Sequence, residues 1–202
     1  MNDLQRAYVK KMTALVEKYG VPAGYHSEVF PAIVAQACLE SNWGKSVLSA
    51  SYHNHWGMKC GTKWKGAAVK LTTKEEYKPG ELTTIKDAFR LYLCDDEGVA
   101  GYFDFIAAKR YANLKKCSDP LEYIELLKKD GWATSGTYVE NVTVIYNMIK
   151  GDLSDSVTTG PNLEELARNV IAGKYGNGAR RRAALGAYYR PVQEIVNRML
   201  KG

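Results

Sequence analysis

The sequence of 202 residues predicts a mainly α-helical domain with a small β-hairpin lobe, plus a small three-helix module at its C-terminal end. Apolar residues recur at helical spacing over most of the chain, whereas 70–85 is rich in Thr on both sides of a Pro-Gly pair. The charge is also uneven, because residues 162–202 hold eight Lys or Arg against three acids and so carry +5 of the net charge of +6. Such asymmetry is typical of two units with different partners.

Five helices are predicted within residues 1–151, near 3–19, 28–43, 96–107, 119–130 and 135–149. In the first of them Leu4, Tyr8 and Met12 repeat at helical spacing. The stretch 64–92 is expected to form short strands around Pro79-Gly80, a pair typical of turns. A mainly helical domain with one hairpin lobe has the layout of lysozyme-like α+β folds, in which a cleft runs between the lobes. Fold analogy alone assigns no activity.

Residues 152–161 are small and polar and lack periodicity, so they are predicted to form a linker. The linker separates a domain of residues 1–151 from a module of residues 162–202. The module is expected to contain three helices, over 163–171, over 180–185 and from Pro191 onward. Three short helices in about 40 residues can just sustain a small core.

The composition, with 46% apolar and 25% charged residues, is that of a folded chain rather than a disordered one. No apolar run approaches the roughly 18–20 residues that cross a bilayer, so stable membrane insertion is not expected. Lys10, Lys11 and Glu17 interrupt the first helix, which therefore lacks a signal-peptide core and predicts synthesis in the cytoplasm. The four cysteines are scattered, form no CxxC pair and are expected to remain thiols: Cys38, Cys60, Cys94 and Cys117.

Glu40 is a lone carboxylate at the end of an apolar segment. Residues 29–39 leave no wide polar face, which predicts a helix that is buried nearly all round. Gly44 suits the end of this helix, so Glu40 is expected in the last turn. There, desolvation and the negative end of the helix dipole both raise the pKa of the carboxyl and favour the protonated form that a general acid needs. The alternative is an ordinary glutamate exposed to solvent at a helix end.

The run His53-Asn54-His55 suggests a metal site or a nuclease, but neither is expected. In HNH nucleases, which are named after a His, an Asn and a second His, these three residues lie far apart in the sequence. Here they are contiguous. No further carboxylate or thiolate pair completes a set of ligands. Polar loop residues near the cleft explain the run better, and neither a metal nor another cofactor is predicted.

Five sequence elements occur in an order that resembles one known family. They are Ala-Gln-Ala-Cys-Leu-Glu-Ser-Asn-Trp-Gly-Lys-Ser (35–46), His-Asn-His-Trp-Gly-Met-Lys (53–59), Thr-Thr-Lys-Glu-Glu-Tyr (72–77), Phe-Arg-Leu-Tyr (89–92) and Gly-Trp-Ala-Thr-Ser-Gly-Thr-Tyr (131–138). Together they resemble the glucosaminidase family of bacterial cell-wall hydrolases, glycoside hydrolase family 73, over about residues 10–150. The resemblance implies hydrolysis of β-1,4 glycosidic bonds in peptidoglycan.

The same resemblance places the general acid on Glu40, in agreement with the environment expected from the apolar pattern. A second carboxylate from the hairpin lobe falls best on Glu76, immediately before Tyr77. Its neighbour Glu75 points to the opposite face of a strand, so only one of the two can face the cleft. A wide gap between the two carboxylates suggests inversion. A neighbouring-group mechanism that uses the N-acetyl group of the substrate is the alternative.

The resemblance also implies contacts with the glycan. Aromatic rings pack on the apolar faces of sugars, and polar side chains bind hydroxyl and acetamide groups. The predicted substrate-binding residues are Trp43, Asn54, Trp132, Thr134 and Tyr138. Trp56 is expected in the core instead. Trp132 replaces the usual Tyr of the family, so any hydrogen bond made by a phenolic hydroxyl at this position is lost.

Residues 162–200 contain Gly-Asn-Gly at 176–178, followed by Val-Gln at 192–193 and Val-Asn at 196–197. With these residues the segment resembles a second family, the CW-seven cell-wall-binding repeat. It implies binding to peptidoglycan, with a contact surface of Tyr175, Asn177, Arg181 and Tyr189. The basic charge also suits nucleic acid, but 180–182 is the only dense Arg run and no recognition helix or zinc framework accompanies it. Nucleic acid is therefore not expected as a partner.

The implied protein is an endo-β-N-acetylglucosaminidase that acts as a modular endolysin. The wall-binding module raises the local concentration of an insoluble substrate. Made in the cytoplasm, the enzyme reaches the wall after release, for example through a holin-type lesion. Three alternatives stay open: a muramidase that cuts the other β-1,4 linkage, a wall-binding protein with an inactive hydrolase domain, and a nucleic-acid-binding protein favoured by charge alone.

Overall fold

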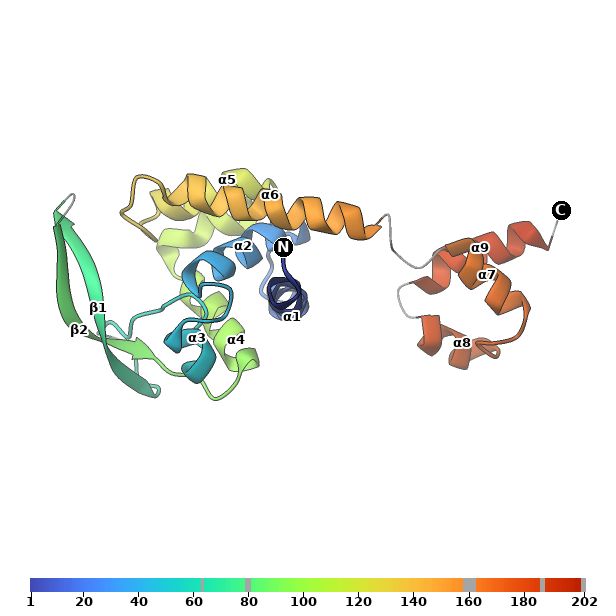
Figure 1. The fold of residues 1–202 in the computed structure, drawn as a ribbon, viewed down its shortest axis with the longest axis horizontal. Coiled ribbons are helices and arrows are strands. Elements are labelled where there is room, and N and C mark those ends of the chain that lie inside the picture. The colour runs from blue at the N-terminus through green and yellow to red at the C-terminus, as the bar shows by residue number, and fades with distance from the viewer. Residues whose placement is uncertain (63, 79–80, 158–162, 186–187, 201–202) are drawn as a thin grey trace. The chain divides into compact units, whose positions relative to one another are not determined.

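The computed structural model describes residues 1–62, 64–78, 81–157, 163–185 and 188–200, and within these ranges it leaves out the side chains of 73–78, 81–85, 153–157, 179 and 183. The chain forms two compact units, Met1–Asp152 and Leu153–Gly202, each with its own cluster of buried apolar residues. Figure 1 shows the elements in order. None of the helices in the described ranges has the length and apolar character needed to span a membrane.

The first unit confirms the predicted mainly helical fold with a hairpin lobe. Its elements are α1 (Asp3–Gly20), η1 (Ser27–Val29), α2 (Phe30–Glu40), α3 (Val47–Tyr52), β1 (Ala68–Lys78), β2 (Glu81–Arg90), α4 (Asp95–Ile106), η2 (Lys109–Lys116), α5 (Pro120–Lys129) and α6 (Tyr138–Val157). The short elements α3 and η2 were not predicted. Neither segment is long enough for apolar residues to recur at helical spacing. In η2 the many basic residues also leave few apolar positions.

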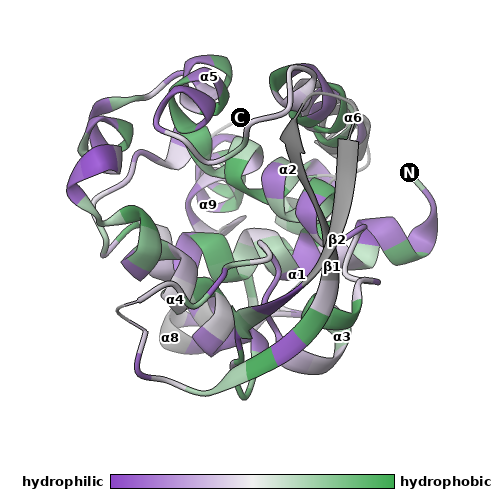
Figure 2. Cartoon of the chain, turned by 90° about the vertical axis from the view of Figure 1, so that its left-hand side faces the viewer, coloured by the Kyte–Doolittle hydropathy of each residue, from purple (hydrophilic) through white to green (hydrophobic). Residues whose placement is uncertain are grey.

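Helix α2 forms the centre of the first unit. Every residue from Ala32 to Cys38 is buried, as the continuous apolar pattern predicts. Pro31 lies in the first turn, where a missing backbone N–H costs nothing. Figures 1 and 2 show α2 from two perpendicular directions, lying among α1, α4, α5 and α6. This enclosure fixes the end of the helix, where Glu40 lies.

The hairpin is longer than the short strands predicted from the sequence. β1 and β2 pair antiparallel from Ala68 opposite Arg90 to Lys78 opposite Glu81, with an irregularity in register between Glu76 and Lys78. The base of the hairpin is tied to the helical part of the unit, because Cys60 N–H donates to the Ala88 carbonyl at 2.8 Å. The lobe therefore places the end of β2 beside the loop that follows α3.

Helix α6 runs well past its predicted end near residue 149 and continues to Val157. The first part of the predicted linker, 152–157, is therefore helical, and the prediction was wrong there. Small polar residues do not stop a helix by themselves, and Gly151 costs only about 1 kcal/mol within one. The helix also gains a tertiary contact, since Arg6 donates to the Asp152 carboxylate at 2.8 Å. The rest of the predicted linker, 158–161, lies outside the described residues.

The second unit contains the three short helices that the sequence predicts. They are α7 (Leu163–Ile171), α8 (Gly178–Leu185) and α9 (Tyr189–Met199). Their shared core is small and consists of Ala167, Val170, Leu185, Val192 and Val196. Apolar residues at helical spacing on α7 and α9 thus meet each other, and the polar faces of both helices remain outside.

Candidate functional site

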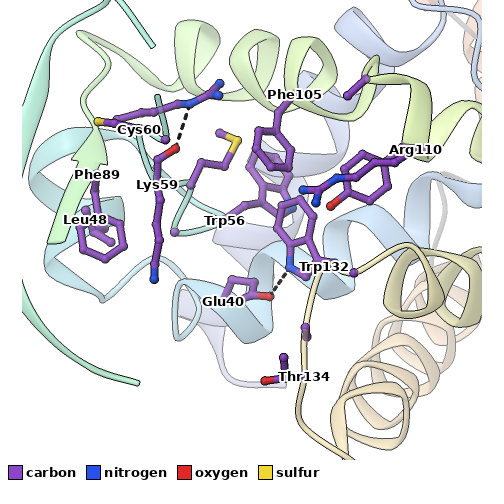
Figure 3. Close-up of a pocket in the computed structure, with 18 of the residues that line it drawn as sticks. Glu40, Leu48, Trp56, Lys59, Cys60, Phe89, Phe105, Arg110, Trp132 and Thr134 are labelled. Atoms are coloured by element: carbon purple, nitrogen blue, oxygen red, sulfur yellow. Dashed lines mark hydrogen bonds between the residues drawn. The ribbon is translucent and has the colours of Figure 1, made fainter. Parts of the chain in front are cut away.

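A cavity of about 1230 Å³ opens on the first unit and contains Glu40. It is larger than the roughly 300–1,000 Å³ typical of small-molecule sites, as a polymeric ligand requires. The end of α2, the loop after α3, the end of β2, α4, η2 and the loop before α6 supply its walls. The lining includes Glu40, Leu48, Trp56, Lys59, Phe89, Arg90, Asp104, Phe105, Arg110, Tyr111, Trp132, Thr134 and Tyr138. Figure 3 shows these walls around Glu40 and Trp132.

A tight turn after α2 fixes the direction of the helix end. Three successive residues have positive φ, namely Asn42 (49°), Trp43 (58°) and Gly44 (80°). A side chain at Gly44 would meet the Tyr8 ring at 2.6 Å, so only glycine fits there. Ser41 Oγ donates to the Ala37 carbonyl at 2.6 Å and accepts from the Gly44 N–H at 2.8 Å. Glu40 is the last residue of α2. The next residue, Ser41, is fixed by its bonds to Ala37 and Gly44, so the position of Glu40 at the helix end is fixed as well.

The Glu40 carboxyl is half-buried, and burial raises its pKa above the ordinary value. Two neighbours act in the opposite direction, because Trp132 and Tyr138 stabilise the ionised form. Burial is the larger effect, so the structure agrees with the sequence argument that Glu40 holds a proton more tightly than an exposed glutamate. Such a carboxyl suits general acid catalysis.

The indole of Trp132 fixes the Glu40 carboxyl. Its Nε1–H donates to Glu40 Oε1 at 2.8 Å, shown as a dashed line in Figure 3. The ring itself is held by edge contacts with Tyr102 at 5.7 Å and Phe105 at 5.5 Å between centroids. Trp132 has no phenolic hydroxyl, and its indole N–H is the donor to Glu40.

Tyr138 approaches Glu40 from the start of α6. Its side chain is 5% exposed, and within the described part of the chain its hydroxyl has no hydrogen-bond partner of good geometry. Burial raises the pKa of this hydroxyl, and the nearby Glu40 charge acts in the same direction. Behind it, Gln36 accepts from the Tyr102 hydroxyl at 2.7 Å. The wall behind Glu40 thus presents buried hydroxyl and amide groups rather than charges.

Replacing Trp132 by Phe is expected to shift the pH dependence of catalysis. The hydrogen bond from Trp132 lowers the pKa of Glu40, so its removal raises that pKa further while an aromatic ring remains. Glu40 then stays protonated to higher pH, and the alkaline limb of kcat/KM moves upward. The matched control is Trp64→Phe, because the Trp64 indole donates to the Ala67 carbonyl, away from Glu40. A downward shift, or an equal shift in both variants, contradicts this role for Trp132.

Two of the predicted substrate-binding residues do not face the cavity. Asn54 is 1% exposed, and its side-chain amide forms hydrogen bonds with the backbone of Met58 and Arg90. It donates to the carbonyls of Met58 and Arg90, both at 2.9 Å, and accepts from the Met58 N–H at 2.8 Å. It therefore holds two walls of the cavity and has no group left for a sugar. Trp43 lies in the positive-φ turn, packs against the core and does not line the cavity.

The other predicted residues of the first unit fall into two groups. Trp132, Thr134 and Tyr138 line the cavity together with Glu40, and their roles in substrate binding stay predictions. Glu76 and Glu75 lie in β1, opposite Leu82 and Thr83. Their side chains lie outside the described residues, so the second carboxylate stays a prediction. Trp56 is 2% exposed and stacks on Tyr102 at 4.1 Å, in the core as expected, although it also touches the cavity.

His53 and His55 converge on one carboxylate. Asp95 Oδ1 lies 2.8 Å from His53 Nδ1 and 2.9 Å from His55 Nε2, and Lys11 Nζ lies 2.6 Å from Asp95 Oδ2. The close packing of α4 requires Gly98, where a side chain would collide with the His53 carbonyl. In the described part of the chain no group of three His, Cys, Asp or Glu residues could hold a metal ion.

The network continues into the core and reaches the turn after Glu40. His55 Nδ1 lies 2.6 Å from Ser49 Oγ and 3.1 Å from the Tyr8 hydroxyl, which lies 2.9 Å from Ser41 Oγ. His55 is 1% exposed, so the expectation of a polar loop residue near the cleft was wrong for it. A serine, a histidine and an aspartate in contact resemble a nucleophilic triad, but Ser49 is 2% exposed and out of reach of a polymer.

In the second unit the predicted contact residues have mixed surroundings. Arg181 bonds within its own unit, to the Gly176 carbonyl (3.0 Å), Gln193 Oε1 (3.2 Å) and Asn177 Oδ1 (3.0 Å). These bonds hold the glycine-rich turn against α9. Tyr175 and Tyr189 pack partly against the small core, and Asn177 remains exposed. The turn around Asn177 is thus stabilised by Arg181, and the exposed Asn177 is accessible to a ligand.

Two family models match this chain, one in each unit. The family model described as mannosyl-glycoprotein endo-beta-N-acetylglucosaminidase matches residues 9–151, and the model of the CW_7 repeat matches residues 164–200. The first match covers most of the chain and includes every element that lines the cavity.

Known proteins give the same result. The peptidoglycan hydrolase FlgJ of Pseudomonas aeruginosa is 34% identical over 135 residues, which are 64% of this chain and 32% of that protein. The exo-glucosaminidase LytG of Bacillus subtilis is 30% identical over 179 residues, which are 83% of this chain and 59% of that protein. The chain thus spans about a third to three fifths of the length of these relatives.

Among solved structures, a peptidoglycan hydrolase mutant from Sphingomonas sp. A1 is similar in fold. The TM-score is 0.61 with 27% sequence identity, over 70% of this chain and 92% of that one. The similarity therefore extends to nearly the whole of the compared structure.

Proposed function

The chain belongs to the glucosaminidase family, and we propose that it hydrolyses the glycan strand of bacterial peptidoglycan as an endo-β-N-acetylglucosaminidase. The proposed bond is the β-1,4 linkage that follows N-acetylglucosamine. One observation carries the proposal: the half-buried Glu40 carboxyl, with its pKa raised by burial, is fixed by Trp132 in a cavity large enough for a polymer. The names of the relatives, peptidoglycan hydrolase and exo-glucosaminidase, support the substrate class.

Glu40 supplies the proton in this reaction. The Trp132 hydrogen bond occupies Oε1, so Oε2 carries the proton to the glycosidic oxygen of the departing sugar. The buried hydroxyl and amide groups behind the carboxyl bring no positive charge that would ionise it early. As the bond breaks, the proton leaves Glu40, and the Trp132 N–H stabilises the carboxylate that forms.

The hairpin supplies the second group in this proposal. Glu76 remains the proposed carboxylate, because it directly precedes Tyr77 in the motif shared with the family. Glu76 activates a water on the far side of the sugar from Glu40, or the N-acetyl group of the substrate takes over the role of nucleophile.

The second unit holds the enzyme on its substrate. The match to the CW_7 repeat supports binding to the cell wall, with the turn around Asn177 and the neighbouring Tyr175 and Tyr189 as the contact surface. Binding through this unit keeps the catalytic unit near an insoluble polymer and raises the effective substrate concentration. The combination of a catalytic unit and a wall-binding unit supports a role as a modular endolysin that clears bacterial walls.

Digestion of purified peptidoglycan tests the proposed function. The digest is reduced with borohydride, and mass spectrometry then identifies the reduced ends. Reduced N-acetylglucosamine as the new end supports the glucosaminidase, because the cut follows that sugar. Reduced N-acetylmuramic acid as the only new end replaces it with the muramidase. An absence of new ends, with binding to walls intact, indicates a wall-binding protein without hydrolase activity.

A further inference from the structure

Two arginines line the Glu40 cavity, and neither is part of the chemistry described above. Arg90 ends β2, and Arg110 lies in η2. Both line the cavity together with Phe105 of α4, which lies between them in contact with both. Three segments that are separate in the sequence thus bring two positive charges to one wall. We call Arg90 and Arg110 the arginine pair.

Aromatic rings hold the arginine pair in place. The Arg90 guanidinium carbon lies 5.1 Å from the Phe105 ring centroid and 4.4 Å from that of Trp64. The Arg110 guanidinium carbon lies 5.7 Å from the Phe105 centroid and 4.5 Å from that of Tyr111. The two charges are therefore no farther apart than the sum of their distances to Phe105. Stacking orders a guanidinium but leaves its N–H edge available for hydrogen bonds.

No carboxylate among the described residues neutralises the arginine pair. Neither arginine forms an ion pair in that part of the chain, although the exposed Asp104 lines the same cavity. Arg90 donates to the Lys59 carbonyl at 3.3 Å, a bond that Figure 3 draws as a dashed line and that leaves its charge unpaired. Lys59 itself pairs with Asp87 at 2.9 Å. The wall therefore offers two ordered cations to whatever enters the cavity.

A buried polar group beside the pair also lacks a partner. Tyr111 lines the cavity and is fully buried, and in the described part of the chain its hydroxyl has no hydrogen-bond partner of good geometry. The neighbouring Arg110 guanidinium lowers the pKa of this hydroxyl, whereas burial, the larger effect, raises it. Because the hydroxyl is closed to solvent, Arg110 and not Tyr111 meets a ligand that enters the cavity.

The chemistry of the wall selects a carboxylate as the ligand. Arginine binds carboxylates through two parallel N–H bonds. This step rests on the proposed function: the sugars of a peptidoglycan strand are neutral except at the muramyl branch, which carries carboxylates on its peptide or, once stripped, on its lactyl group. Those carboxylates are the anions that lie next to a bound strand.

We propose that the arginine pair forms a subsite that binds a muramyl-branch carboxylate of the substrate. The subsite fixes the register of the strand, because a carboxylate occurs on only one of the two alternating sugars. It thereby favours placement of one linkage over the other beside Glu40. The subsite also raises affinity for strands that carry these charges over neutral chito-oligosaccharides.

Kinetics on three soluble substrates test the proposal. They are peptide-bearing glycan strands, strands stripped by an amidase so that the lactyl carboxylate is free, and strands whose carboxyl groups are amidated with carbodiimide and methylamine. The main variant is Arg110→Gln, which removes an exposed cation whose contacts described above are with aromatic rings. Lys109→Gln is its matched control, because Lys109 is an exposed cation one residue away that does not line the cavity.

The charged strands are expected to show the difference. Loss of a hydrogen-bonded charge pair raises KM for Arg110→Gln about tenfold or more, with kcat nearly unchanged. On amidated strands the variant and the wild type have the same KM, and Lys109→Gln behaves as wild type throughout. An effect that persists on stripped strands identifies the lactyl carboxylate, and one confined to peptide-bearing strands identifies the peptide. Both results support the proposal.

Two results overturn the subsite. One is an equal rise in KM on charged and amidated strands, and the other is no rise at all. Failure of the proposed function looks different, because the wild type then cleaves none of the strands. In that case binding of the same strands, measured by calorimetry on Glu40→Gln protein with and without Arg110→Gln, still tests the subsite. Equal affinities for charged and amidated strands again exclude it.

Discussion

The Glu40→Gln variant is expected to lose nearly all hydrolytic activity and to keep its binding to cell walls. Glutamine has the shape of protonated glutamic acid but cannot donate a proton to a leaving sugar. General acid catalysis contributes about 10²–10⁴-fold, so kcat should fall by that factor. The measurement is the rate at which new reducing ends form in a peptidoglycan suspension, together with co-sedimentation of the protein with the same walls.

Stability gives a second, independent readout for this variant. Burial raises the pKa of Glu40 in the folded state, so the folded protein binds a proton more tightly than the unfolded chain. Stability is therefore lost as pH rises from the unfolded pKa through the folded pKa, where a charge must be buried. The glutamine of the Glu40→Gln variant carries no charge at any pH, so this variant should be at least as stable as the wild type at neutral and alkaline pH.

Glu17→Gln is the matched control for Glu40→Gln. Glu17 is exposed on α1 and does not line the cavity, and the change removes the same group. Its activity and stability should equal those of the wild type. Retention of more than about a tenth of the wild-type kcat by Glu40→Gln, in protein shown to be folded, rules out Glu40 as the general acid.

The second large effect is expected from Asp95→Ala, which should destabilise the first unit by about 2–4 kcal/mol. Asp95 accepts from His53, His55 and Lys11, and its removal leaves the buried His55 nitrogen and the lysine without an acceptor. His55 in turn contacts Tyr8 and Ser49, so the loss reaches the core around the end of α2. Chemical denaturation followed by tryptophan fluorescence measures the change.

Asp96→Ala is the control for this prediction. Asp95 and Asp96 are neighbours in the first turn of α4, so both lie near the positive end of the same helix dipole. Asp96 pairs with the exposed Lys18 and with Tyr19 instead of a buried histidine. Its replacement should therefore destabilise the protein much less. Equal destabilisation by the two changes would show that the buried network adds nothing.

The pH dependence of the Asp95 effect follows from its pKa. Hydrogen bonds from His55, Lys11 and His53 hold the pKa of this carboxyl well below its usual range. A lowered folded pKa contributes stability that is fully present above the unfolded pKa of about 3.9 and is lost as pH falls through the folded value. The difference between wild type and Asp95→Ala should thus be full at about pH 6 and shrink below about pH 4.

Much of the fold could be predicted because its patterns are local. The continuous apolar run before Glu40 predicts a buried helix, and α2 is buried from Ala32 to Cys38. The Pro-Gly pair predicts a hairpin, although the strands are longer than expected because the pairing continues to Arg90. The ends of helices were harder, since α6 continues beyond Gly151 through a tertiary contact of Asp152 that no local pattern reveals.

The sequence predicts site residues that lie within family motifs. It does not predict contacts between residues that are far apart in the sequence. Family motifs singled out Glu40, Trp132 and Tyr138, which the structure brings to one cavity, and the family itself is confirmed. They misplaced Asn54, because an asparagine that binds backbone looks the same in a sequence as one that binds a sugar. The Tyr8 and His55 contact joins residues 47 positions apart and could not be foreseen.

Arg90 and Arg110 were missed for a related reason. Arg90 lies inside the Phe-Arg-Leu-Tyr motif, which was a signal, but nothing in the sequence connects it with η2. Only Phe105, packed against both side chains, brings the two arginines to one wall. Convergence of this kind depends on the tertiary fold and appears only in three dimensions.

Titration of the Glu40 carboxyl tests most directly whether Glu40 holds the proton that a general acid must donate. Carbon-13 NMR of the side-chain carboxyl, assigned by the signal that Glu40→Gln removes, gives its pKa in the folded protein. We expect a midpoint clearly above the value of about 4.3 of an ordinary glutamate, coincident with the alkaline limb of kcat/KM. A midpoint at or below that value would mean that Glu40 is ionised where the enzyme works and cannot donate the proton.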